Sequence, residues 1–325
     1  MGRLTMLRRA GLSMVVCTLF GVQAQAVPQD KRKDPDQIGN RDVGTGVNFY
    51  SLEKEIALGK QLAQEIEREA KLTDDWALAE FVNRLAQNLA RNSDLKVPVT
   101  AKVIDSPQVN AFALPGGFLF VNSGLIVEAE TEAELAGALA HEIAHVAARH
   151  GTRQASRGQI ANLASIPLIF MGGWGGFAAR QGAGVAVPMA FLKFSRGFEE
   201  EADMLGVQYM YKAGYDPTAF VDFFEGLAAL EKRKPGTLSE IFRTHPKIES
   251  RIQTAQANIQ EMLREQPQYV ITTSEFDGVR KQLSATLNRR KGPDKTGPTL
   301  YRRERDNSET DDERPTLRRR NPLVD

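Results

Sequence analysis

The sequence predicts an α+β fold that is mostly helical and carries a small antiparallel sheet. Leu52 to Ala90 shows helical periodicity in two segments that break near Thr73-Asp74-Asp75. Three short segments then have the apolar patterning of strands: 97–104, 109–114 and 118–122. Pro115-Gly116-Gly117 is expected to turn the chain between the last two strands. An apolar helix over residues 131–150 follows the sheet.

That helix contains the most informative motif of the chain, His141-Glu142-Ile143-Ala144-His145. Because residues i and i+4 of an α-helix lie on one face, the imidazoles of His141 and His145 can reach a single Zn²⁺ ion. Glu142 is turned about 100° away around the helix and can reach the water that such a metal activates. The spacing therefore predicts a metal, a base and a hydrolytic reaction.

The surroundings of the motif favour a metal site over a chance pattern on a surface helix. Thr131 and Glu134 form a capping box, and Gly151 stands where a glycine is expected to end the helix. Small and apolar residues dominate between these two ends, so the helix is expected to be buried. Two histidines and a glutamate inside a buried helix would lose their hydration without compensation, and a metal ion supplies the missing partner.

Composition limits the class of protein. The chain has 325 residues, of which 42% are hydrophobic and 26% charged, as in an ordinary soluble globular protein. Its formal net charge of +1, with no dominant basic stripe, argues against nucleic acid as a partner. The single cysteine, Cys17, lies in a segment that is expected to be removed. A zinc site must therefore use histidine and carboxylate ligands.

Residues 1–26 have the pattern of a secretory signal peptide. Basic residues (Arg3, Arg8 and Arg9) precede an apolar run from Ala10 to Val22 that is too short to span a bilayer, and Ala24-Gln25-Ala26 is a small-x-small cleavage site. We expect a soluble protein exported to a bacterial periplasm. A mitochondrial presequence is a weaker alternative, and the apolar residues around Cys17 disfavour a lipoprotein.

The rest of the chain divides into a linker at 27–46, a main domain at 47–270 and a charged tail at 271–325 that is expected to be disordered. The tail repeats Pro-Thr-Leu-x-Arg-Arg at 298–303 and 315–320. Residues 158–192 are rich in glycine and nearly uncharged, and we interpret them as a buried or lid-like segment rather than a membrane hairpin. Peripheral association with a membrane or an envelope complex through 158–192 or the tail remains an alternative.

Three further helices are predicted within the main domain. They run from about Ser195 to Gly214, from Pro217 to Lys232, and from His245-Pro246 through Ile248 to Gln266.

A catalytic zinc keeps three protein ligands, and the third must be a carboxylate, His150 or His245. The best carboxylates lie in the stretch from Ser195 to Asp203. Glu199 and Asp203 are one helical turn apart, so Glu199 can bind zinc while Asp203 orients a ligand histidine from behind. Consecutive acids cannot all face one metal, so Glu200 and Glu201 are expected to be solvated.

At this point the chain resembles a known family. The H-E-x-x-H motif followed by S-R-x-x-E-x-x-A-D at 195–203 is similar to the signature of the gluzincin metallopeptidases, which include CAAX prenyl protease 1, HtpX and BepA. The stretches 110–117 (NAFALPGG) and 244–246 (THP) agree as well, so the resemblance covers about Leu52 to Ile259. The lack of clear transmembrane helices points to the soluble, periplasmic BepA-like branch.

The resemblance implies a zincin-type domain with one zinc ion per chain, bound by His141, His145 and Glu199, with Asp203 behind them. Glu142 is expected to act as general base and then general acid. The segment Asn110 to Leu114 is implied to be an edge strand that adds an extended peptide to the sheet, which makes Asn110, Ala111 and Phe112 substrate-binding residues.

His245 is also implied to lie near the metal. Its imidazole could hydrogen-bond the oxyanion formed during hydrolysis, or it could block the open position of the metal. Packing as an ordinary residue before Pro246 is the alternative.

The expected function is that of a zinc-dependent endopeptidase that cuts extended or misfolded envelope proteins in protein quality control. One alternative is a non-proteolytic, chaperone-like envelope factor with an autoinhibited zinc site. A membrane protease that acts on lipid-embedded substrates is another.

Overall fold

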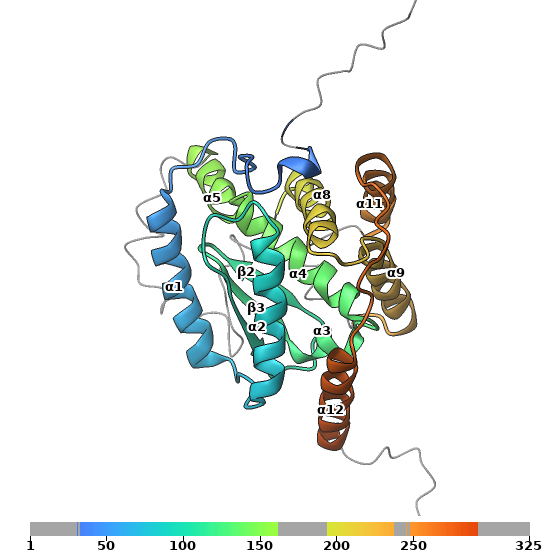
Figure 1. The fold of residues 1–325 in the computed structure, drawn as a ribbon. Coiled ribbons are helices and arrows are strands. Elements are labelled where there is room, and N and C mark those ends of the chain that lie inside the picture. The colour runs from blue at the N-terminus through green and yellow to red at the C-terminus, as the bar shows by residue number, and fades with distance from the viewer. Residues whose placement is uncertain (1–30, 32, 162–193, 237–244, 246–247, 292–325) are drawn as a thin grey trace, which may run out of the picture.

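The computed structural model describes residues 31, 33–161, 194–236, 245 and 248–291. Its elements run in the following order: η1 (Pro35–Gln37), α1 (Leu52–Glu69), α2 (Trp76–Arg91), β1 (Thr100–Ile104), β2 (Ala111–Leu114), β3 (Phe118–Asn122), α3 (Ser123–Glu128), α4 (Glu132–Ala147), α5 (His150–Ala161), α8 (Arg196–Lys212), α9 (Thr218–Arg233), α11 (Ile248–Met262) and α12 (Ser274–Lys291). Mostly helical structure around one small sheet confirms the predicted α+β class (Figure 1).

The sheet is mixed, which corrects the predicted antiparallel arrangement. Its strand order is β1-β3-β2. β2 and β3 are antiparallel, with Ala111 opposite Val121, whereas β1 runs parallel to β3, with Thr100 opposite Phe118. The tight turn at 115–117 folds β3 directly back along β2, but the longer connection at 105–110 lets the chain leave β1 and return one strand further away. β2 therefore lies at an edge of the sheet, as the family resemblance implied.

Helices cover both faces of the sheet (Figure 1). On one face, Phe112, Leu114 and Phe120 pack with apolar residues of α1 in a small cluster. Ala111, Ala113 and the alternate residues of β3 join the main core on the other face, with α2 and α4. The period of two between successive side chains thus separates two cores, and the small alanines of β2 face the side on which α4 lies.

Helix α4 runs through the centre of the molecule and contacts β2, α2, α8 and α9 (Figure 1). It is buried along almost its whole length, as predicted. The Thr131 hydroxyl accepts a hydrogen bond from the Glu134 backbone N–H at 3.2 Å, while the Glu134 carboxylate accepts one from the Glu130 N–H at 2.8 Å. The N-terminal cap was therefore predicted correctly.

The predicted end of this helix was wrong. α4 ends at Ala147, and the residue in the left-handed region is Arg149, with φ of 57°, rather than Gly151. Gly151 lies inside the next helix, α5, which begins at His150. Arg149 is held in this conformation by its side chain, whose guanidinium lies 2.6 Å from the buried Glu55 carboxylate and donates to the Tyr50 carbonyl. These contacts of the Arg149 side chain stabilise a left-handed backbone conformation that glycine adopts more easily than arginine.

Parts of the predicted linker and of the tail predicted to be disordered pack against the fold. Within the predicted linker, the buried Arg41 guanidinium lies 2.8 Å from Asp94, which also accepts a hydrogen bond from the Tyr209 hydroxyl at 2.9 Å. Within the predicted disordered tail, residues Ser274–Lys291 form α12. Phe276 of α12 is fully buried, with its ring 6.1 Å from that of Phe81. Leu283 of α12 is buried as well, so the charged composition of this segment led to a wrong prediction for residues that pack on the core.

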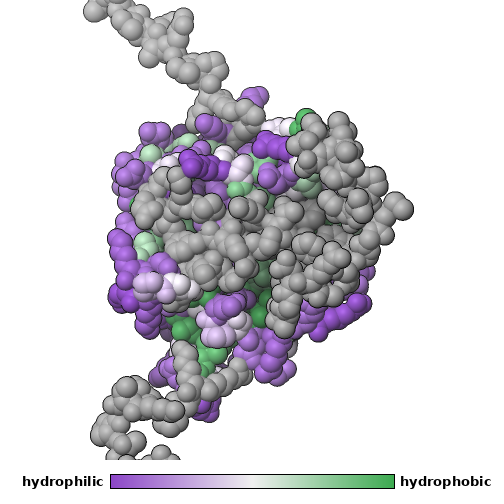
Figure 2. Space-filling view, turned by 180° about the vertical axis from the view of Figure 1, so that it is seen from behind, coloured by the Kyte–Doolittle hydropathy of each residue, from purple (hydrophilic) through white to green (hydrophobic). Residues whose placement is uncertain are grey.

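Several predictions concern residues outside those described. They are the signal peptide at 1–26, most of the glycine-rich segment 158–192, and the repeats at 298–303 and 315–320. Among the described helices, none combines the length and the apolar character that crossing a membrane requires. Seen from behind, the described residues around the periphery of the molecule are mostly hydrophilic (Figure 2).

Candidate active site

Two helices that pack very closely bring the predicted site residues together. α4 carries His141, Glu142 and His145, and α8 carries Glu199. A Cβ atom added to Gly206 of α8 would lie 3.1 Å from the His141 backbone nitrogen, closer than ordinary contact. The absence of a side chain at Gly206 therefore allows the two backbones to approach at the position of a site histidine.

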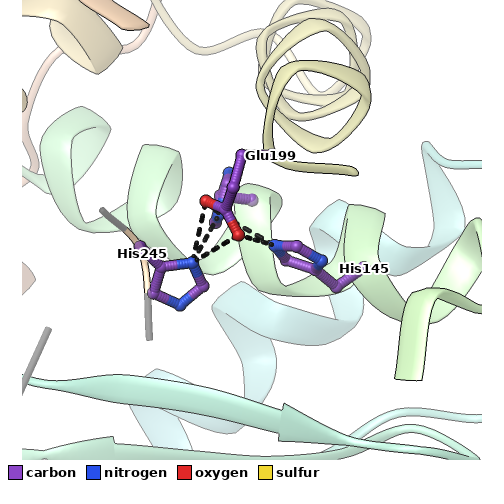
Figure 3. Close-up of side chains that lie close together, drawn as sticks. His145, Glu199 and His245 are labelled. Atoms are coloured by element: carbon purple, nitrogen blue, oxygen red, sulfur yellow. Dashed lines mark hydrogen bonds and ion pairs between the residues drawn. The ribbon is translucent and has the colours of Figure 1, made fainter. Parts of the chain in front are cut away.

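Four buried side chains converge in a cluster that can hold a metal ion: His141, His145, Glu199 and His245. One nitrogen or oxygen atom from each lies within 4.8 Å of the others. The Glu199 carboxylate points from α8 between the rings of His145 and His245 (Figure 3). Its oxygens lie 3.5 Å from His145 Nε2 and 3.0 Å from His245 Nδ1. The His141 and His145 Nε2 atoms are 3.0 Å apart.

The donor set fits a four-coordinate metal. A tetrahedral zinc site with bonds of about 2.1 Å separates its ligand atoms by about 3.4 Å. Glu199 Oε2 lies 3.5 Å from His141 Nε2, and His245 Nδ1 lies 3.3 Å from the same nitrogen. With the 3.0 Å between the Nε2 atoms of His141 and His145 and the 3.0 Å between His245 Nδ1 and Glu199 Oε2, these distances are close to the edge length of such a tetrahedron. The described donors include no sulfur.

The ionisation of these groups favours a cation. Burial, followed by the neighbouring His141, holds the pKa of His145 well below its ordinary value, so this imidazole keeps its lone pair free. Burial opposes ionisation of Glu199, yet His245 and His141 outweigh it and hold the Glu199 pKa well below its ordinary value. Burial likewise opposes protonation of His245, but the Glu199 and Glu142 carboxylates raise its pKa to about 10. The neutral His145 imidazole and the ionised Glu199 carboxylate are the forms in which these side chains bind a metal ion.

Asp203 lies behind His141, as predicted. Its Oδ1 atom is 2.9 Å from His141 Nδ1, the ring nitrogen that faces away from the cluster. Hydrogen bonds of this kind fix the orientation and tautomer of a metal-binding histidine. Burial opposes ionisation of Asp203, but Arg251 outweighs burial and lowers the Asp203 pKa, so the carboxylate stays ionised.

Arg251 of α11 is a site residue that the sequence analysis missed. Its buried guanidinium makes a two-pronged contact with Asp203, at 2.6 and 2.8 Å, and lies 3.2 Å from Glu199. The guanidinium also lies 4.4 Å from the centre of the Phe224 ring. A signal was available, because Arg251 interrupts the apolar stripe of α11 between Ile248 and Ala255. A charge on the apolar face of a helix indicates a buried partner.

Glu142 is held from two sides. Its Oε2 atom accepts a hydrogen bond from the Ala113 backbone N–H at 3.0 Å, and its Oε1 atom lies 3.3 Å from His245 Nε2. His245 therefore contacts the metal cluster through Nδ1 and the predicted base through Nε2. The predicted location of His245 near the cluster is correct.

Backbone groups of β2 face the site in alternation. The Asn110 carbonyl accepts a hydrogen bond from the Asn122 N–H, so Asn110 and every second residue after it bond to β3. Ala111 and Ala113 instead direct their backbone groups to the opposite edge, along which no described strand pairs. The bond from Ala113 to Glu142 agrees with this alternation. Phe112 differs from the prediction, because its backbone belongs to the ladder with β3 and its ring stacks 5.4 Å from Phe120.

The Asn110 side chain differs from its neighbours. Its buried Oδ1 atom has no hydrogen-bond partner within the described part of the chain. A buried amide oxygen without such a partner is able to accept an N–H group.

His150 and Glu201 also adjoin the cluster. The Nδ1 atoms of His150 and His145 are 2.9 Å apart, and His150 Nε2 lies 3.0 Å from Glu201 Oε2. Glu200 is exposed, as expected, but Glu201 is only partly exposed and lies between His150 and Arg153. The prediction that Glu201 is solvated was wrong, because its carboxylate on α8 faces the buried His150 ring and hydrogen-bonds with it.

A small apolar cavity of about 30 Å³ adjoins Glu142 and His245. Its walls include Ala111 of the free strand edge, Leu125, Phe223 and Leu227. A residue of β2 and the predicted base therefore line the same hollow.

Comparison with known proteins agrees with this geometry. Residues 76–259, more than half of the chain, match peptidase family M48. The chain belongs to peptidase family M48. The matched range contains the four cluster residues, Asp203 and Arg251.

Individual M48 relatives carry protease names. The chain is 30% identical over 247 residues to the beta-barrel assembly-enhancing protease of Escherichia coli strain K12, covering 72% of this chain and 49% of the relative. It is 31% identical over 230 residues to the protein of that name from Yersinia pestis, covering 68% and 47%. Identity to the mitochondrial metalloendopeptidase OMA1 of Schizosaccharomyces pombe is 36% over 164 residues, covering 49% and 46%. This M48 chain thus spans about half the length of these relatives.

Proposed function

We propose that this M48 chain is a zinc-dependent endopeptidase. The observation that carries the proposal is the buried cluster of His141, His145 and Glu199, with the Glu142 carboxylate on the adjacent position of the same helix. Two imidazoles and one carboxylate are a ligand set that zinc uses in catalytic sites, where a further position stays open for water. We propose one zinc ion per chain.

In this proposal, His141, His145 and Glu199 hold the zinc. The bound ion would lower the pKa of a water molecule and polarise the scissile carbonyl. Glu142 removes a proton from the attacking water and later passes it to the leaving amine, acting first as base and then as acid. Asp203 and Arg251 keep His141 oriented and balance the charge behind it.

The substrate is proposed to bind as an added strand along β2. Ala111 and Ala113 direct their backbone groups to the strand edge, where the Ala113 N–H is bonded to Glu142. This mode recognises backbone more than side chains, which suits extended or misfolded polypeptides. A peptide at this edge would compete with Glu142 for the Ala113 N–H, so binding would release the carboxylate for catalysis.

His245 is proposed to block the site in the conformation described. Its Nδ1 atom lies 3.0 Å from Glu199 and 3.3 Å from His141 Nε2, where the attacking water would otherwise bind. Its Nε2 atom meanwhile contacts the Glu142 carboxylate. The alternative role of His245, donating to the oxyanion, requires the ring to leave this position.

The cellular setting is proposed from two observations. The relatives from Escherichia coli and Yersinia pestis are named for enhancing β-barrel assembly, and residues 1–26 have the pattern of a signal peptide. We therefore propose export to the periplasm and action on envelope proteins in quality control.

Comparison of the wild type with Glu142→Gln tests this function. Glutamine matches glutamate in shape but cannot accept the proton, so the variant should keep its zinc and lose casein cleavage. The cleavage rate and the zinc content should be measured on the same preparations. Substantial cleavage by pure Glu142→Gln would reject Glu142 as the base. Zinc binding without cleavage by the wild type, before and after removal of the His245 imidazole, would favour a chaperone-like factor.

A further inference from the structure

We propose that His150 is a positioning residue that fixes the tautomer and orientation of the metal ligand His145, through a relay that ends at Glu201. The proposal rests on the zinc site described above. It assigns a role to a buried histidine that neither belongs to the metal cluster nor contacts the base.

The contact between the two rings permits a single arrangement of protons. His145 directs Nε2 into the cluster, so a metal would take that lone pair and the ring proton must be on Nδ1. The His145 Nδ1 atom lies 2.9 Å from His150 Nδ1. Since two N–H groups cannot face each other at this distance, His150 must offer a lone pair there and carry its own proton on Nε2.

The outer end of the relay matches that arrangement. His150 Nε2 lies 3.0 Å from Glu201 Oε2, so the proton on Nε2 has a carboxylate acceptor. The same oxygen lies 3.2 Å from the Arg153 guanidinium, which also donates to the Ala148 carbonyl at 2.9 Å. Arg153 thereby holds the Glu201 carboxylate in place beside His150 Nε2.

Packing holds the His150 ring in one orientation. The residue is fully buried, and its ring stacks on that of Phe198 with centroids 4.3 Å apart. On the inner side, the ring of Phe194 stacks on His145 at 3.9 Å. With both rings fixed, the hydrogen bond between them sets the direction of the His145 lone pair.

The two histidines of the motif are therefore supported differently. His141 is backed directly by the Asp203 carboxylate, whereas His145 is backed by an imidazole that transmits the influence of Glu201. Partners that orient a metal-binding histidine typically change metal affinity about 10–100-fold when they are removed. The same size of effect is expected at His150.

Paired substitutions at His150 separate this role from simple packing. In His150→Asn the side-chain oxygen can take the position of Nδ1 and still accept the proton of His145, whereas His150→Leu fills space but accepts nothing. We expect His150→Leu to bind zinc about 10–100-fold more weakly than the wild type. His150→Asn should recover most of that loss, although it fills the space no better. Zinc affinity is measured by competition with a chelator, and thermal unfolding of the zinc-free proteins checks their folding.

Glu201 and Glu200 provide a matched pair on one helix. Glu201→Leu removes the acceptor that fixes the tautomer of His150, whereas Glu200→Leu changes an exposed acid one residue away. Zinc affinity should fall in Glu201→Leu and stay at the wild-type value in Glu200→Leu. If His150→Leu does not fold, the comparison of Glu201→Leu with Glu200→Leu tests the proposal in its place.

Nitrogen NMR of the zinc-loaded wild type reads the tautomers directly, since the chain contains only 4 histidines. We expect the proton of His150 on Nε2 and that of His145 on Nδ1. A proton on His150 Nδ1 would overturn the proposal, and so would equal zinc affinity of His150→Leu, Glu201→Leu and the wild type. A wild type that binds no zinc would overturn both this proposal and the proposed function, whereas zinc binding that is indifferent to His150 would overturn this proposal alone.

Discussion

A single imidazole, that of His245, contacts both halves of the proposed machinery. One nitrogen lies within 3.3 Å of the metal-binding atoms of His141 and Glu199, and the other lies 3.3 Å from Glu142. In the proposed mechanism, a ring in this position would leave neither the water position nor Glu142 free. The activity of this protein should therefore depend on the fraction of molecules in which the His245 ring lies in this position.

His245→Ala should increase peptide cleavage while zinc content stays at the wild-type level. If the unblocked state is populated at about 10% or less, removal of the ring should raise the cleavage rate about tenfold or more. Steady-state cleavage of a peptide and zinc content measured together check this. Loss of cleavage with zinc retained would instead assign His245 to the oxyanion. Unchanged cleavage with lower thermal stability would reduce it to packing.

Glu199→Ala should lose zinc, and Glu200→Ala should keep it. The Glu199 carboxylate lies within 3.5 Å of the metal-binding nitrogens of both motif histidines, whereas Glu200 is exposed. Loss of one of three ligands should weaken zinc binding by far more than the about 10–100-fold expected for an outer partner. Metal analysis after dialysis measures the difference. Equal zinc in both variants would show that the third ligand lies elsewhere.

The sequence predicted residues whose roles follow from spacing along one helix. His141, His145 and Glu142 share such a spacing, and so do Glu199 and Asp203. Arg251 and Glu201 were missed because their partners are 48 and 51 residues away in the chain. A contact at that separation is fixed by tertiary packing and leaves only indirect signs, such as a charge on an apolar helix face.

At the scale of elements, the close packing of α4 against α8 positions the site. Gly206 faces the backbone at Ala140 and His141, and Gly137 of α4 lies against Met210 of α8 and Phe220 of α9. Small residues at these crossings allow His141 and Glu199 to approach within 3.5 Å. The spacing between the two helices therefore determines the geometry of the metal ligands.

Gly206→Ala should destabilise the fold and distort the site. The added methyl group would lie 3.1 Å from the His141 nitrogen, and overpacking of this kind costs about 1–3 kcal/mol. Gly197→Ala on the same helix is the control, because a Cβ there meets nothing within 4 Å. It should be neutral or stabilise by about 0.4–1 kcal/mol. Urea unfolding and zinc affinity should be measured for both variants. Equal stability of the two would contradict the close approach of α8 to the backbone of α4.

Local signals predicted the bounds of most elements, whereas their pairing depended on distant contacts. Capping and apolar periodicity placed α4 and α8 within a few residues of their observed ends. The parallel pairing of β1 with β3 could not be read from either strand, because the alternation of side chains is the same in both directions. α12 was missed because charged residues dominate its composition, although Phe276, Val279, Leu283 and Leu287 recur at helical spacing and pack on the main core.

At the scale of the whole molecule, the site unites segments that are far apart in the chain. The edge strand β2, the motif helix α4, α8, His245 and α11 each contribute one part, from Ala113 to Arg251. The buried carboxylates Glu199 and Asp203 face buried imidazoles and a guanidinium in one apolar interior. Such an assembly is costly without its cation, so metal binding and the integrity of the site should be coupled.

Removal and return of zinc tests whether peptide cleavage by this protein depends on an ion bound at the cluster. The full chain should contain one zinc ion per chain, lose casein cleavage when a chelator removes the ion, and regain it on addition of about one equivalent of zinc. Cleavage that persists in demonstrably zinc-free protein would contradict the account. A wild type that binds no zinc at the cluster of His141, His145 and Glu199 would contradict it as well.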